Sequence, residues 1–167
     1  MASVKYGCLD PNPKTIMMPV AASQYFYHNG VCAVNVDGNG HLTVLETADT
    51  TVFGIAVPPK GRGNTTNTSD LYWMSSATAG KDKIPVILVT GGYKFLLPSS
   101  GTVAITNIGN ACDIVAANSA TASYVDLANA DTNIFVIQGL GTDFCNYASG
   151  TDVVVKLNRN VIQADTA

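Results

Sequence analysis

The chain has 167 residues, a formal net charge of -3, and charged side chains at only 13% of its positions. Soluble domains usually carry about 25% charged residues, and a chain without a basic patch is poorly suited to neutralising nucleic acid phosphates. No apolar run reaches the roughly 18 residues that a membrane helix requires. We therefore expect one domain that binds neither nucleic acid nor membrane, and whose apolar surplus is covered by other protein subunits.

The first segment, residues 1–19, is interrupted by Pro11, Pro13 and Pro19. Proline cannot donate to a backbone ladder, and it favours extended chain. We predict an extended N-terminal arm over residues 1–19, followed by a single domain over residues 20–167. The segment has no apolar run of the length that a secretory signal needs, so the expected site of synthesis is the cytoplasm.

Short segments rich in β-branched and aromatic residues dominate the rest of the chain, at a spacing typical of sandwiches and barrels. The fold class that they predict is all-β, a single β-barrel or sandwich-like domain. Only one short helix is expected, over residues 122–130. The predicted strands begin at Tyr25 and then cover residues 31–36, 41–45, 52–57, 84–89, 93–97, 103–105, 114–116, 134–140 and 153–157.

Two features refine this pattern. The step Asp37-Gly38 between two apolar runs predicts a hairpin turn. Residues 48–55 (ADTTVFGI) match residues 130–137 (ADTNIFVI), with a cysteine-bearing strand before each copy and a valine-rich strand after it. Either two equivalent halves of one barrel or chance similarity in a chain rich in Ala, Thr and Val would explain the match.

Residues 60–83 form a long polar stretch that we predict to be a loop, and loops of this length in compact domains are usually functional or disordered. The stretch carries Tyr72, Trp73 and Met74, including the only tryptophan. Such a tryptophan either covers the core or anchors a partner, because interfaces are enriched in Trp, Tyr and Met.

Residues for chemistry are scarce. The chain has two histidines, His28 and His41, and one glutamate, Glu46, and no recognised nucleophile or phosphate-binding motif is present. The aspartates are expected to cap turns. The four cysteines lack metal-ligand spacing and are expected to be small buried thiols: Cys8, Cys32, Cys112 and Cys145. We expect no enzyme activity, no cofactor and no metal; Ala48 stands where a calcium loop beginning at Asp37 would need its glutamate.

Residues 48–57 (ADTTVFGIAV), then 83–88 (KIPVIL) before 91–95 (GGYKF), together with 131–140 and 151–157, form a pattern over residues 30–157. This pattern resembles the small head-decoration, or capsid cement, proteins of tailed bacteriophages. The resemblance implies a barrel-like β core, a place on the outside of the virion capsid, the major capsid protein as partner and a homotrimer. The long stretch 60–83 departs from the shortest members of that family.

The sequence thus predicts a virion structural protein that cements neighbouring capsid subunits. The expected partner contacts are Pro11, Pro13 and Pro19 in the arm, and Tyr72, Trp73 and Met74 in the loop. Two alternatives stay open at this point. One is a carbohydrate-binding module or other appendage or fibre subunit that uses exposed aromatic side chains, and the other is a small enzyme that uses an aspartate pair.

Overall fold

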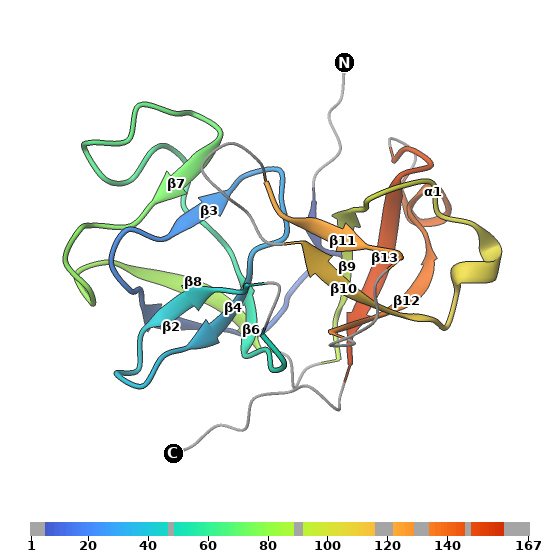
Figure 1. Cartoon of the computed structure of the whole chain (residues 1–167), viewed down its shortest axis with the longest axis horizontal. Helices are drawn as coiled ribbons and strands as arrows, with labels where there is room; N and C mark the ends of the chain where they lie inside the picture. The colour runs from blue at the N-terminus through green and yellow to red at the C-terminus, as the bar shows by residue number, and fades with distance from the viewer. Residues whose placement is uncertain are drawn as a thin grey trace.

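The computed structural model describes residues 6–46, 49–88, 92–115, 122–128, 134–145 and 148–158. In Figure 1 two antiparallel sheets lie side by side, with β3 and β7 beside the first of them. The all-β, sandwich-like prediction is confirmed. The barrel prediction is not, because neither sheet closes. No helix of the described ranges is both long and apolar enough to cross a bilayer.

The first sheet, sheet I, has five strands and comes from the N-terminal half of the chain. Every neighbouring pair in it is antiparallel. Its strands, in spatial order, are β2 (Thr15–Pro19), β8 (Lys83–Leu88), β6 (Gly54–Ala56), β4 (Ala33–Val36) and β5 (Leu42–Val44).

The second sheet, sheet II, has six strands, of which five come from the C-terminal half. Its neighbouring pairs are also antiparallel. Its strands, in spatial order, are β1 (Gly7–Cys8), β9 (Lys94–Pro98), β13 (Asp152–Leu157), β12 (Phe135–Leu140), β10 (Ala111–Val115) and β11 (Tyr124–Asp126).

The two sheets repeat one topology. In chain order, β2, β4, β5, β6 and β8 of sheet I correspond to β9, β10, β11, β12 and β13 of sheet II. Each set is arranged in space as first, fifth, fourth, second and third strand. The predicted internal repeat is therefore confirmed for these strands, but as two five-stranded units rather than two halves of one barrel. Parts of the repeated segments, residues 48 and 130–133, lie outside the described residues.

Contacts at the ends of the strands repeat as well. A single isolated parallel bridge joins the first strand of each unit to its third, Val20 to Leu42 and Ser99 to Val125. The next residue along donates a backbone hydrogen bond to the same partner in each unit: Ala21 to Leu42 at 2.9 Å, and Ser100 to Val125 at 2.8 Å. One isolated bridge does not close a sheet, which is why each unit stays an open sheet.

A shared core lies between the two sheets. Buried side chains from sheet I, including Ile55 and Ile87, belong to the same cluster as Phe95, Leu97 and Val155 of sheet II. A second core lies within the N-terminal half, where Ile84 and Val86 of β8 are fully buried. Strand β8 thus contributes side chains from its two faces to the two cores.

A two-stranded sheet of β3 (Tyr25–Tyr27) and β7 (Tyr72–Met74) covers the second core. Phe26 and Trp73 are register partners, with their ring centroids 5.8 Å apart. Phe26 is completely buried, and Tyr27 beside it is 5% exposed. The prediction that residues 60–83 are only a loop is wrong, because β7 pairs with a strand distant in the sequence. Sheet II has no counterpart of this pair among the described residues.

The predicted arm is also corrected over its described residues, 6–19. They contain β1 at the edge of sheet II and β2 at the edge of sheet I, so the segment links the two sheets instead of projecting from them. The Tyr6 hydroxyl donates a hydrogen bond to Asp152 Oδ1 at 2.9 Å, which fixes the start of the segment to β13. The prolines predict that this segment is extended. They do not predict which strands it pairs with, because β8 and β9 are distant in the sequence.

Two further elements differ from the predictions. Residues 124–126 of the predicted helix form β11, because Val125 is completely buried opposite Ile114 of β10. Residues 103–105 were expected to form a strand, but Ile105–Asn107 is a 3-10 helix and Val103 lies outside any strand. A four-residue helix, α1 (Gly141–Phe144), follows β12.

The hairpin predicted at Asp37 is confirmed. Asp37 Oδ1 accepts hydrogen bonds from the backbone N–H groups of Asn39 and His41, at 2.9 and 2.8 Å. Gly40 takes the left-handed conformation that the turn requires, with φ of 81°. The backbone N–H of His41, and then that of Asn39, hold the pKa of Asp37 below its ordinary value.

We predict that Asp37→Ala lowers the free energy of unfolding by about 1–3 kcal/mol at pH 7, because hydrogen bonds to a charged acceptor are lost. A lowered native pKa means that this stabilisation exists above the unfolded pKa and disappears as pH falls through the native pKa. Urea unfolding at pH 7 and at pH 2.5, which lies roughly a unit below the ordinary aspartate pKa, should show the difference between wild type and variant shrinking in acid. A difference that grows in acid would contradict this account.

Candidate functional site

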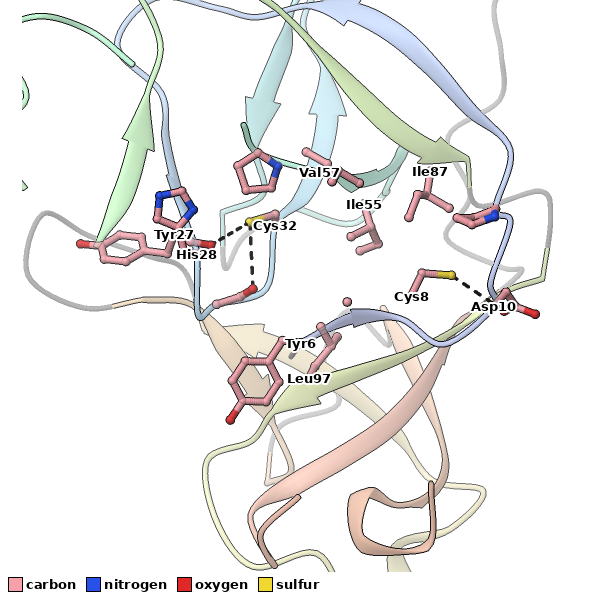
Figure 2. A pocket seen from close by; sticks show the side chains of 15 residues that line it. Tyr6, Cys8, Asp10, Tyr27, His28, Cys32, Ile55, Val57, Ile87 and Leu97 are labelled. Carbon is pink, nitrogen blue, oxygen red and sulfur yellow. Dashed lines mark hydrogen bonds between the residues drawn. The ribbon is translucent and has the colours of Figure 1, made fainter. Parts of the chain in front are cut away.

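A cavity of about 340 Å³ lies between the two sheets (Figure 2). Ile55 and Ile87 of sheet I line one side of it, and Leu97 of β9 lies on the other side. Residues before and after β1 complete the wall, including Tyr6 and Asp10. The cavity volume is within the range of small-molecule sites. The side chains that the two sheets contribute to its wall are mostly apolar.

The cysteines of this cavity are unreactive in character. Burial raises the pKa of the Cys32 thiol to about 12, and its Sγ donates to the Tyr27 carbonyl at 3.3 Å. Burial also raises the pKa of Cys8, whose Sγ lies 3.8 Å from Asp10 Oδ2. Since the thiolate is the nucleophilic form, neither group is activated at neutral pH. Cys32 and Cys112 are buried as predicted, whereas Cys8 and Cys145 are partly accessible, and all four are free.

The aspartates mostly cap turns, as predicted. Asp49 Oδ2 accepts from the Glu46 N–H at 2.7 Å, Asp126 Oδ1 from the Ala128 N–H at 3.0 Å, and Asp152 Oδ2 from the Ser149 N–H at 2.6 Å. Asp131 lies outside the described residues. These carboxylates accept hydrogen bonds from backbone N–H groups in turns, which is the role that their positions in the sequence predicted.

One aspartate pair is brought together across a ladder. Asp113 and Asp126 are register partners on β10 and β11, and Asp113 is buried. Asp113 Oδ1 accepts from the Ile114 N–H at 3.0 Å, and Asp126 is engaged by its turn. Neither lines the cavity between the sheets. Within the described ranges, no three His, Cys, Asp or Glu side chains gather as a metal would require.

The prolines expected to contact a partner lie in different environments. Pro11 is exposed, Pro13 lines the cavity between the sheets, and Pro19 ends β2 opposite Lys83. Only Pro11 thus remains fully available to another molecule. The structure separates these residues because β1 and β2 join different sheets.

The three loop residues that were expected to contact a partner also differ in exposure. Trp73 is only 7% exposed and packs in the core, whereas Tyr72 and Met74 are partly exposed. The Tyr72 ring makes an edge contact with Tyr25, with centroids 5.1 Å apart. Leu71, just before β7, is 60% exposed. A sequence reading that groups residues 71–74 cannot tell which of them points inward, because that depends on the pairing of β7 with β3.

Large apolar side chains are exposed at several places that the sequence analysis did not single out. Ile105 is 74% exposed and Met17 59%. Met17 lies in a row across sheet I with Pro85 and Val57, since Met17 is the register partner of Pro85 and the Val57 N–H donates to the Pro85 carbonyl at 2.8 Å. Val57 is itself exposed and also lines the cavity, so an apolar surface runs from the cavity to the edge of sheet I.

No protein-family model, curated protein or solved structure matches the chain.

The burial of Trp73 yields a test of the carbohydrate-binding alternative. Because the ring is enclosed with Phe26, we predict that added oligosaccharides leave the fluorescence of this single tryptophan unchanged and that iodide quenches it poorly. Trp73→Ala should lower the free energy of unfolding by about 3–5 kcal/mol. A saturable change of Trp73 emission with a sugar would contradict this placement and support the alternative.

Proposed function

We propose that the protein is a structural component of a tailed-phage virion that binds the outside of the assembled capsid and bridges its major capsid subunits. The observation that supports this proposal is the combination of few charges with exposed apolar side chains such as Leu71 and Ile105. Apolar side chains form the buried centre of protein interfaces, so each of these exposed side chains is a candidate contact with another protein. The resemblance of residues 30–157 to capsid cement proteins supplies the partner.

A structural role also suits the cavity and the aspartates. The Cys8 and Cys32 thiols are shifted away from the thiolate form, and both aspartates of the pair on β10 and β11 accept hydrogen bonds from backbone N–H groups. We propose a non-catalytic protein whose two units act as a rigid platform. The contact residues that we propose are Leu71 with Tyr72 and Met74 on the loop, and Pro11 on the segment before β2.

Binding to a shell that exists only after assembly stabilises the assembled state by mass action. A cement protein therefore needs affinity for adjacent subunits in the lattice and little for a free subunit. Two sheets in one chain offer two separate surfaces for that purpose. One is the insertion that carries β7, and the other is the 3-10 helix around Ile105.

The test is co-sedimentation of the purified protein with heads from its source, and with unassembled capsid subunits as the control. We expect the wild type to sediment with heads only. Leu71→Asp should reduce occupancy about tenfold or more, as loss of an apolar interface anchor does.

Thr66→Asp adds the same charge at an exposed position of the same loop and should leave occupancy unchanged. Wild-type protein that stays in the supernatant with heads would overturn the proposed function. Equal occupancy of Leu71→Asp would overturn the loop contact alone.

A further inference from the structure

Among the described residues no strand covers the outer edge of β2, whereas the equivalent edge of the second unit is covered. Strand β9 has β13 on one side and β1 on the other. Its counterpart β2 pairs with β8 on one side, and in the described part of the chain no strand pairs with its other side. The repeated topology thus shows a strand position that β1 fills in sheet II and that no strand of the described residues fills in sheet I.

The register identifies the backbone groups that face this edge. Met17 lies opposite Pro85, which has no N–H, so these two form a non-hydrogen-bonded pair. Ile16 and Met18 therefore bond to β8, while Thr15 and Met17 direct their N–H and C=O groups outward. Their counterparts in sheet II are Lys94 and Leu96, and the Lys94 carbonyl accepts the Leu9 N–H at 2.9 Å.

The side chains of β2 are also more exposed than those of its counterpart β9. Phe95 and Leu96 of β9 are each 1% exposed, whereas their counterparts Ile16 and Met17 are 38% and 59% exposed. Exposed edge strands are usually protected by charges, prolines or bulges. The first four residues of β2 contain none of these, and its one proline, Pro19, stands at its end. These four residues are therefore competent to accept another strand.

We propose that this edge pairs with the β2 edge of a second copy of the chain, antiparallel about a twofold axis at Ile16, in place of the homotrimer that the resemblance to capsid cement proteins implies. Thr15 of each copy would then lie opposite Met17 of the other, and four backbone hydrogen bonds would form. The two Ile16 side chains would meet on one face of a continuous ten-stranded sheet.

The sequence of the strand favours a second copy as the occupant. Within residues 15–18 every side chain is uncharged, so no like charges oppose each other when the strand pairs with itself. Lys14 lies just before this stretch, and Pro19, which has no N–H, lies just after it. Closed twofold dimers are the commonest symmetric assembly. When two identical edges pair, the outward backbone N–H and C=O groups of both copies find hydrogen-bond partners.

The interface is short, so we expect a dimer that dissociates on dilution. Sedimentation equilibrium over a wide concentration range should show the mass rising from 17.4 kDa towards twice that value. Met17→Pro removes an outward N–H at a position where edge strands tolerate proline, and it should remain at the monomer mass. Met17→Lys, which keeps the backbone, should weaken dimerisation by placing two lysines at the new ladder.

Thr65→Lys is the matched control, since it adds the same charge at an exposed position outside β2, and it should dimerise as the wild type does. Circular dichroism and Trp73 fluorescence report whether each variant is folded. A wild type that stays at 17.4 kDa at all concentrations, or that forms a trimer, would overturn the proposal. So would folded Met17→Pro and Met17→Lys variants that both dimerise normally. These outcomes leave the capsid proposal standing, because shell binding is measured separately.

Discussion

The packing of the two sheets against each other is the constraint on which the rest of this structure depends. Each of the two sheets has an apolar face that must be removed from water, and neither sheet can cover its own. Ile55 and Ile87 of sheet I meet Phe95 and Leu97 of sheet II in one cluster. The cavity between the sheets lies beside this cluster, and the segment that carries β1 and β2 spans both sheets at the same place.

The differences between the units follow from this packing. Sheet I is apolar on both faces: Ile87 points into the shared core, while Ile84 and Val86 point into the second core. The second face needs a cover, which β3 and β7 provide through Phe26 and Trp73. The long connection between β6 and β8 therefore has a structural purpose before any role in binding. What it leaves exposed, Leu71 above all, is available for a partner.

The sequence predicted the fold class, the Asp37 turn and the repeat, because each depends on local periodicity or on residues close in the chain. It missed β7, whose three residues lie in a polar stretch and are held by pairing with Tyr25–Tyr27. It also placed a helix where Val125 instead enters the core from β11. The burial of Trp73 and the difference in pairing between the outer edges of β2 and β9 depend on strand partners distant in the sequence, which periodicity does not identify. Comparing the two units reveals the difference, since β1 pairs with the outer edge of β9 and no strand of the described residues pairs with the outer edge of β2.

The central claim is that the units are equivalent except where one is left open to a partner. Site-resolved amide hydrogen exchange of the wild-type chain at low and high concentration tests it most directly. At low concentration the Leu96 amide, paired with β1, should exchange slowly and the Met17 amide quickly. At high concentration the Met17 amide should slow while Leu96 stays unchanged. A Met17 amide that is already protected in the monomer, or that exchanges quickly at every concentration, would contradict the account.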